Sequence, residues 1–158
     1  MKKEITIAAS SAVALIILLG SASYLLFPKV SVQASTASID AYTQRGGKGS
    51  NTPGGNFSIA QNDTVYIFAE VRNASNIPQG NRSISFEIHW PANGSQNGSI
   101  YDVGSSQTNA SGIAEIETIP LWHPRFKIQD PQGTWLVYVT ISMDDQHLAD
   151  TLTFSVQQ

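Results

Sequence analysis

The distribution of apolar residues divides the chain into two different parts. Residues 5–27 carry no charged side chain, and a helix needs about 20 apolar residues to cross the hydrocarbon core of a bilayer. Beyond residue 37, apolar and polar residues alternate with a period of two in short segments separated by Gly, Pro and Asn. This second pattern predicts β-strands joined by turns. We therefore expect one N-terminal helix followed by an all-β body.

About seven strands are expected in the second part. Residues 83–90 alternate clearly, with apolar side chains at every second position, whereas residues 134–142 are apolar at most positions and favour a central strand. The expected strands are residues 38–43, 64–72, 83–90, 98–103, 112–119, 134–142 and 147–156. Residues 44–58, rich in Gly, Ser and Pro, are expected to form a flexible loop. This arrangement is typical of an immunoglobulin-like β-sandwich, with Trp135 as the best candidate for the centre of its core.

The first residues indicate on which side of a membrane the β-rich part lies. Lys2 and Lys3 precede the apolar run and favour a cytoplasmic N-terminus. The run exceeds the apolar region of about 7–15 residues usual in signal peptides, which favours an uncleaved anchor. Small residues at 20–23 and 32–34 resemble cleavage sites, so a cleaved leader stays open. We expect a signal peptide or membrane anchor over residues 1–29, a linker or N-terminal strand over 30–37, and an extracellular β-sandwich domain over 38–158.

Composition excludes several classes of function. The chain has no cysteine, which excludes disulfides, thiolate nucleophiles and cysteine-based metal sites. Its net charge is −3 and 13% of its residues are charged, against about 25% in an ordinary soluble domain. A nucleic-acid-binding surface needs a basic patch, which this balance does not supply. We find no catalytic motif and expect neither enzymatic activity nor a cofactor.

The acceptor sequence for N-glycosylation, Asn-x-Ser/Thr, is enriched beyond the apolar run. The chain has nine asparagines, and random placement would give about two acceptors at this Ser and Thr content. There are seven instead, at Asn56, Asn62, Asn73, Asn81, Asn93, Asn97 and Asn109. Two of them fall in "PANGSQNGS" (residues 91–99), where Asn-Gly also signals a tight turn. The enrichment predicts covalent N-glycans on an extracellular surface.

Two further groups of residues have candidate binding chemistry. Glu87 and His89 share the outward face of one expected strand and are weak candidates for a metal-ligand pair, although an exposed histidine on a strand is the commoner outcome. Trp122, Arg125 and Phe126 lie between two prolines and could form a contact surface for protein or sugar. The favoured alternative is that these aromatic residues cap one end of the core.

Three motifs together resemble a known type of domain. They are "QNDTVYIFAEVR" (residues 61–72), "TNASGIAEIETIPL" (108–121) and "DPQGTWLVYVTI" (130–141). Their order and spacing resemble the macroglobulin-type β-sandwich domain of alpha-macroglobulins and related prokaryotic surface proteins, over residues 39–156. Residues 40–58 more narrowly resemble a segment of archaeal extracellular proteins. The chain lacks a cysteine-containing thioester motif and a protease bait region, so the resemblance implies a spacer, adhesive or assembly module without protease trapping.

The sequence supports three functions of different classes. The first is a non-catalytic, N-glycosylated cell-surface module, either anchored with its C-terminal domain outside the cell or secreted, that contacts other envelope proteins or copies of itself. The second is a filament subunit in which residues 30–40 add to the sheet edge of the next copy, which requires cleavage upstream of Val30. The third is an extracytoplasmic carrier of a metal or small ligand.

Overall fold

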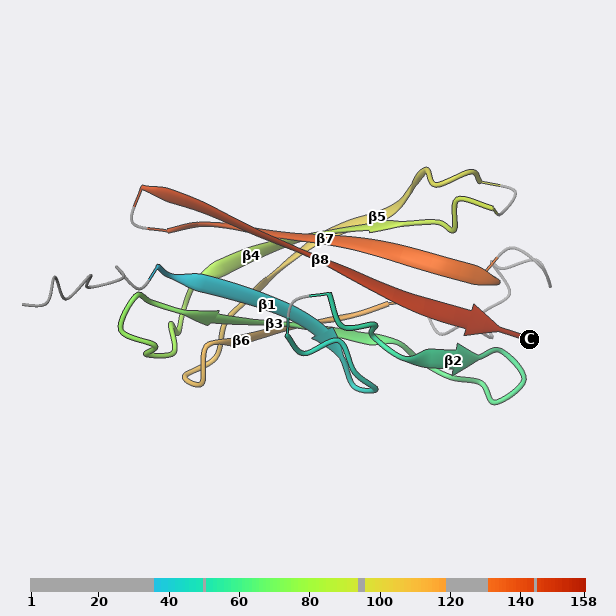
Figure 1. The fold of residues 1–158 in the computed structure, drawn as a ribbon, viewed down its shortest axis with the longest axis horizontal. Coiled ribbons are helices and arrows are strands. Elements are labelled where there is room, and N and C mark those ends of the chain that lie inside the picture. Colours follow the sequence, from blue (N-terminus) through green and yellow to red (C-terminus); the bar gives the residue numbers. More distant parts are fainter. Residues whose placement is uncertain (1–35, 50, 94–95, 119–130, 144) are drawn as a thin grey trace, which may run out of the picture. The chain divides into compact units, whose positions relative to one another are not determined.

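The computed structural model describes residues 36–49, 51–93, 96–118, 131–143 and 145–158, all of which belong to one compact unit, Ser35–Gln158. These residues form an all-β fold of eight strands in two sheets (Figure 1). The strands are β1 (Ser38–Thr43), β2 (Asn56–Ser58), β3 (Tyr66–Arg72), β4 (Ser83–His89), β5 (Ile100–Gln107), β6 (Ile113–Glu117), β7 (Gly133–Met143) and β8 (Gln146–Gln157). In this part of the chain no helix is long and apolar enough to span a membrane. The helix expected over residues 5–27 lies outside the described ranges.

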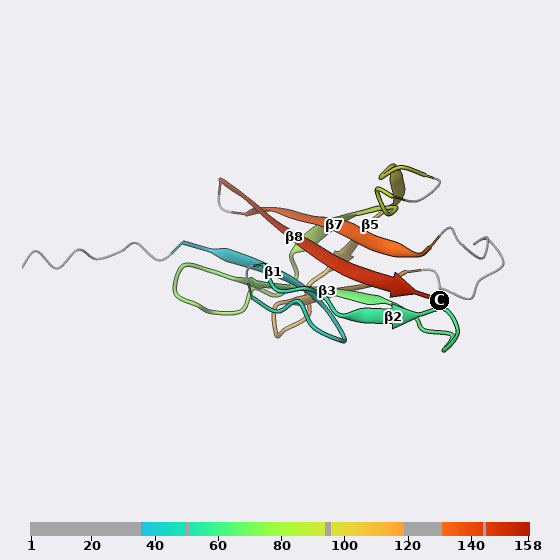
Figure 2. The same cartoon turned by 45° about the vertical axis from the view of Figure 1, so that its right-hand side comes forward.

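The two sheets face each other in a sandwich-like arrangement, which Figure 2 shows from a second direction. One sheet has the order β1-β3-β6 and is antiparallel. The other has the order β2-β8-β7-β4-β5, in which only β2 runs parallel to its neighbour. A long hairpin joins β7 to β8, and Asp145 in its turn has a positive φ of 62°. The β7 strand is therefore central, as its apolar sequence predicts.

The core lies between the sheets and is formed by the inward positions of each strand. The alternation predicted for β3 and β4 is confirmed, since the inward residues Val65, Ile67, Ala69, Val71, Ile84, Phe86 and Ile88 are all buried. Trp135 is also buried, and its ring lies against Trp90, Tyr101 and Phe154 at centroid distances of 5.0, 5.2 and 5.9 Å. Its indole N–H donates to the carbonyl of Pro131 at 2.7 Å. The polar end of this large side chain is thus satisfied inside the core.

Three details of the expected strands are wrong. Part of the expected loop at residues 44–58 is a strand, β2, which pairs with the end of β8 and brings the described strands to eight, against the expected number of about seven. Phe57 in β2 is 1% exposed, so this segment contributes to the core. The strand expected at residues 98–103 begins and ends later, as β5. The outer face of β7 is open to solvent at Thr134, Tyr138 and Thr140, although the sequence suggested an apolar face on both sides.

A carboxylate from one sheet caps the open edge of the other. Asp150 on β8 points inward and accepts a hydrogen bond from the backbone N–H of Ala41 on β1, at 2.7 Å. Unpaired N–H groups on an edge strand invite pairing with another chain, and an inward-pointing charge is one way of blocking it. Residues 38–40, part of the segment considered as a donor strand, already pair with β3 of the same chain. Strand exchange would have to break these contacts.

Candidate functional site

All seven acceptor asparagines lie in the described ranges, and none of them is buried. Asn73 is half-buried and the other six are exposed. Asn56 is the first residue of β2, and the rest lie in connections between strands. Asn62, Asn81 and Asn97 adopt positive φ angles of 54°, 57° and 47°, a conformation that asparagine tolerates better than most residues. Six of the seven acceptors therefore lie in connections between strands.

Two of the acceptors occupy turns of the same construction. Residues 73–77 read Asn-Ala-Ser-Asn-Ile and residues 109–113 read Asn-Ala-Ser-Gly-Ile. In each, the backbone N–H of the fourth residue donates to the carbonyl of the first, and the N–H of the first donates to the carbonyl of the fifth. The fourth residue has a positive φ in both, 61° at Asn76 and 76° at Gly112. The repeated sequence thus encodes a repeated turn.

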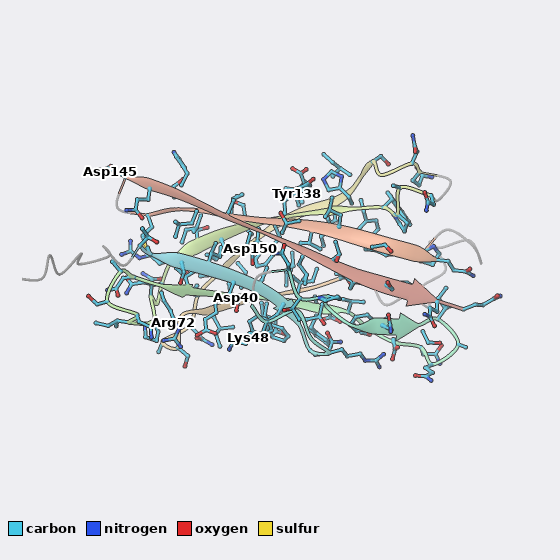
Figure 3. All side chains as sticks on the ribbon, in the orientation of Figure 1. Asp40, Lys48, Arg72, Tyr138, Asp145 and Asp150 are labelled. Atoms are coloured by element: carbon cyan, nitrogen blue, oxygen red, sulfur yellow. The ribbon has the colours of Figure 1, made fainter. Side chains whose placement is uncertain are left out.

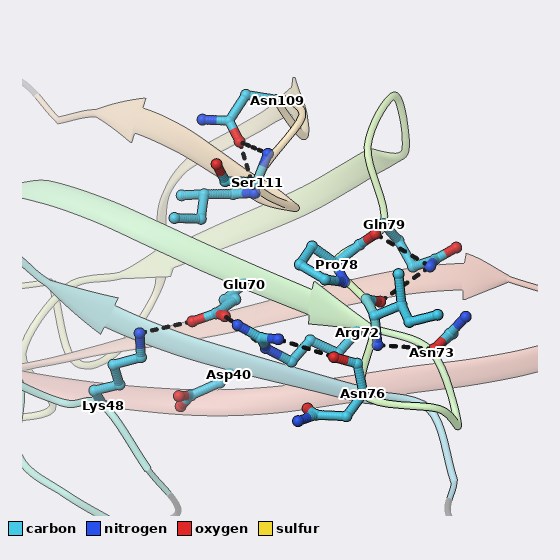
Figure 4. A network of polar contacts seen from close by, with 12 residues as sticks. Asp40, Lys48, Glu70, Arg72, Asn73, Asn76, Pro78, Gln79, Asn109 and Ser111 are labelled. Atoms are coloured by element: carbon cyan, nitrogen blue, oxygen red, sulfur yellow. Dashed lines mark hydrogen bonds and ion pairs between the residues drawn. The ribbon is translucent and has the colours of Figure 1, made fainter.

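The side-chain oxygen of the acceptor organises each turn. Oδ1 of Asn73 accepts from the backbone N–H groups of Ser75 and Ile77, at 2.9 and 3.0 Å. Oδ1 of Asn109 makes the same contacts two and four residues ahead, at 2.9 and 3.2 Å (Figure 4). Only the oxygen of an amide side chain can accept, so these bonds fix which end of the amide faces the turn. Nδ2, the atom that carries the sugar in an N-glycan, is directed away from these donors.

The two turns lie at the same end of the sandwich. The N–H of Val71 donates to the carbonyl of Gly112, and the hydroxyl of Thr108 donates to the carbonyl of Gln79 at 2.6 Å. The third acceptor in this region is Asn81, whose N–H donates to the carbonyl of Thr108. We call residues 71–82 and 108–113 the acceptor end. It brings three of the seven acceptors together from segments more than 25 residues apart in sequence.

An ion-pair network holds the first of these turns against the three-stranded sheet. Glu70 on β3 accepts from Arg72 Nε and from Lys48 Nζ, each at 2.7 Å, and its side chain is 8% exposed. Arg72 Nη1 donates to the carbonyl of Asn76 inside the turn, at 2.9 Å (Figure 4). The hydrogen bond from Lys48 and then the bond from Arg72 outweigh the effect of burial and lower the pKa of Glu70 below its usual value. Figure 3 shows Arg72 and Lys48 on the side of the three-stranded sheet.

The glycine-rich loop between β1 and β2 contributes to this network. Lys48 pairs with Glu70, and the N–H of Gly49 donates to the carboxylate of Asp40 at 2.9 Å. The hydrogen bond with Glu70 raises the pKa of Lys48. Lys48 and the backbone N–H of Gly49 are therefore both engaged by carboxylates of the same chain. These contacts tie the loop to side chains of β1 and β3.

Glu87 and His89 pair with each other on the outer face of the five-stranded sheet. His89 Nε2 lies 2.6 Å from Glu87 Oε1, and Nδ1 lies 2.9 Å from the carbonyl oxygen of Gly98. The hydrogen bond to Gly98, and after it the contact with Glu87, raise the pKa of His89 against the opposing effect of burial. Both ring nitrogens of His89 are therefore directed at oxygen atoms of the same chain. The described ranges contain no group of three or more His, Cys, Asp or Glu placed to hold a metal ion.

The remaining candidates gain no site from the structure. Trp122, Arg125 and Phe126 lie outside the described residues, so the contact surface considered for them stays a prediction. Ser142 Oγ and His147 Nδ1 are 2.8 Å apart, but both residues are exposed and directly opposed on the β7–β8 hairpin. This pair is an ordinary cross-strand contact. Sequence reasoning missed the repeated Asn-Ala-Ser turn, although its five-residue repeat was visible in the chain.

Comparisons with known proteins add no family. No protein-family model and no curated protein matches the chain. Among solved structures it is similar to an engineered protein (TM-score 0.48, 11% identity, 79% of this chain and 21% of that one). It is also similar to the Pseudomonas fluorescens alkylpurine DNA glycosylase AlkC bound to DNA containing an abasic site analog (0.43, 12%, 78% and 31%). A third is the sporulation control protein Spo0M of Bacillus subtilis (0.39, 12%, 78% and 50%). The chain spans half or less of each of these structures, and likenesses this distant carry no functional argument.

Proposed function

We propose that the protein is a non-catalytic, N-glycosylated β-sandwich module of the cell surface, acting in adhesion or envelope structure. The N-terminal apolar segment tethers it to the membrane, or directs its secretion if cleaved. In finer detail the sandwich is of the immunoglobulin-like, macroglobulin type. The observation that carries the proposal is that seven acceptor asparagines, several times the chance number, all lie on one β body and none is buried.

The outer face of the five-stranded sheet supports a function through contact. Its exposed positions on β4, β7 and β8 are mostly hydroxyl-bearing, namely Ser83, Ser85, Thr134, Thr140, Ser142, Thr151 and Thr153. Glu87 and His89 on this face are paired with each other, with His89 Nε2 2.6 Å from Glu87 Oε1. Burying neutral hydroxyls that find new hydrogen bonds costs much less than burying an unpaired charge. Such a face can adhere to a neighbouring protein or glycan without a large desolvation penalty.

The test is an analysis of native protein isolated from its own organism. N-terminal sequencing reports whether the leader is retained, and mass spectrometry of peptides reports sugar at each asparagine. We expect the protein in the membrane or extracellular fraction, with sugar at Asn73 and Asn109 among the occupied sites. Protein produced in a host without N-glycosylation is the control for mass. Recovery of native protein from the cytosol, or all seven acceptors unmodified, would contradict the proposal.

A further inference from the structure

The β3–β4 turn at Asn73 opens onto a hollow that the proposed function leaves unused. It is lined by Ala37 ahead of β1, by residues 73–75, and by Met143 and Gln146 at the β7–β8 hairpin. Its volume is about 320 Å³, at the lower end of the range for pockets that hold small ligands. The lining comes from both sheets. We infer that this hollow is the seat of the first sugar attached to Asn73, an inference that rests on the proposed N-glycosylation.

The attachment point limits where that sugar can lie. Asn73 is itself part of the wall, and its Oδ1 is held by the N–H groups of Ser75 and Ile77. Because the amide cannot rotate without losing both bonds, Nδ2 keeps one direction relative to the turn. The first ring is joined directly to this atom, so it starts at the rim of the hollow. Covalent attachment removes most of the entropy cost that a free sugar would meet on binding there.

The chemistry of the lining matches a hexose or an N-acetylhexosamine. Ala37, Ala74 and Met143 offer methyl groups and a thioether to the C–H face of a pyranose ring. Ser75 and Gln146 offer a hydroxyl and an amide to its hydroxyl groups. The hollow carries no charged side chain among these residues, which suits a neutral sugar. The seated ring would join the start of β1, the acceptor turn and the β7–β8 hairpin.

The covalent step needs a co-reactant, which is a glycosyl phosphate donor of the kind used in N-glycosylation. One N–H bond of Asn73 Nδ2 is replaced by a bond to the anomeric carbon of the sugar. The bond between that carbon and the phosphate oxygen of the donor breaks, and its electron pair leaves with the phosphate. The amide proton is carried away by that leaving group, so no oxidant or reductant is involved. The protein contributes the oriented amide and the surface on which the product rests.

Asn109 provides a matched comparison within the same chain. It has the same turn and the same Oδ1 contacts, but residues 109–111 are all exposed, whereas Asn73 is half-buried. A sugar on Asn109 would therefore extend into solvent. The serine in each turn uses only its backbone N–H for the contact with Oδ1. Replacing either serine by alanine removes the acceptor sequence while leaving the asparagine and its turn bonds in place.

The experiment compares Ser75→Ala with Ser111→Ala in full-length protein made in the native host. Site occupancy is measured by peptide mass spectrometry and thermal stability by differential scanning calorimetry. We expect Ser75→Ala to lower the melting temperature by about 2–5 °C, the shift produced by losing a few contacts in a domain of this size. Ser111→Ala should change it by less than about 1 °C. Gln146→Ala should lower the melting temperature when Asn73 is glycosylated and leave it unchanged in the Ser75→Ala background.

The outcomes distinguish failure of the proposed sugar site in the hollow from failure of the proposed function on which it rests. If both asparagines carry sugar but the two serine variants are equally stable, the seat is refuted and the proposed function stands. The same holds if Gln146→Ala destabilises equally with and without sugar on Asn73, because its effect is then unrelated to a glycan. Sugar on Asn109 but not on Asn73 also refutes the seat alone. If no asparagine of the native protein carries sugar, the proposed function and the seat fail together.

Discussion

Replacing Glu70 by glutamine should reduce the stability of the body and loosen the turn that presents Asn73. The substitution keeps the shape of the side chain and removes its charge. Glu70 accepts from Arg72 and Lys48, and Arg72 in turn donates to the carbonyl of Asn76 within the turn. Loss of the carboxylate therefore removes the anchor of the arginine that holds the turn.

The size of the loss in stability follows from how exposed the side chains of Lys48 and Arg72 are. The side chain of Lys48 is 62% exposed, so its ion pair with Glu70 contributes at most about 0.5–1 kcal/mol after solvent screening. The hydrogen bond from Arg72, whose side chain is 35% exposed, contributes about 1.5–2 kcal/mol. Glutamine retains one acceptor oxygen and is less costly to bury than a carboxylate, which offsets part of this sum. We expect a net loss of about 1–2 kcal/mol in the free energy of unfolding.

The assay is urea unfolding of unglycosylated protein lacking the N-terminal apolar segment, followed by tryptophan fluorescence at several pH values. The folded pKa of Glu70 lies below its unfolded value, so its contribution is complete above the unfolded pKa of about 4.3. This contribution is lost as pH falls through the folded pKa. The difference between wild type and Glu70→Gln should be constant from about pH 6 to 8 and should shrink as the pH falls through the folded pKa of Glu70.

The control for this prediction is Glu115→Gln. Glu115 is an exposed carboxylate on β6 of the same sheet, and a change there should stay within about 0.5 kcal/mol. Hydrogen exchange of residues 74–77 should accelerate in Glu70→Gln only. The reasoning is refuted if both substitutions cost the same at pH 7, or if the loss in Glu70→Gln does not diminish as the pH is lowered into the acid range.

Two further predictions concern contacts between distant segments. Asp150→Ala leaves the N–H of Ala41 without its acceptor, so we expect the free energy of unfolding to fall by about 1–3 kcal/mol and amide exchange at Ala41 to become faster. Asp150→Asn should partly restore both. Unchanged exchange at Ala41 would show that the cap is not needed. The pKa of His89 is raised by its bond to Gly98 and then by Glu87, so its contribution is complete below about pH 6.5 and lost as pH rises through the folded pKa. An NMR titration should give a His89 pKa above 6.5. His89→Gln should remove the loss of stability that accompanies deprotonation of His89 as the pH rises. A measured pKa at or below 6.5 would contradict the contacts.

The elements with a regular side-chain pattern could be predicted from the sequence. β3 and β4 bury one face and expose the other, so their apolar residues alternate and mark both the strand and its inner face. Trp135 was placed in the core because it lies in the most apolar strand, and the structure buries it between aromatic neighbours. In these strands the local pattern and the tertiary packing require the same residues.

The elements that depend on distant partners could not be predicted. β2 has three residues in a glycine-rich segment and becomes a strand because it pairs in parallel with the end of β8, about 100 residues later. The contact of His89 with Gly98 depends on the path of the β4–β5 connection, which the alternation of β4 does not determine. The repeated Asn-Ala-Ser turn is a different case, because its five-residue pattern is local and visible. The sequence indicates acceptors in turns, and a turn at residue 109, but sequence reasoning did not connect this turn with its second copy at residues 73–77.

Asn73 and Asn109 are both turn residues and acceptor asparagines, which raises the question of whether turn formation alone explains the excess of acceptor sequences. Turns require asparagine for its side-chain oxygen at positions 73 and 109 and for its positive φ at positions such as Asn62 and Asn81. Neither requirement extends to a hydroxyl two residues later, since the turns use only the backbone N–H there. Within the described part of the chain the hydroxyls of Ser75 and Ser111 make no hydrogen bond that would explain their presence. At positions 73 and 109, turn chemistry therefore accounts for the asparagine and not for the serine two residues later, which the proposed glycosylation would explain.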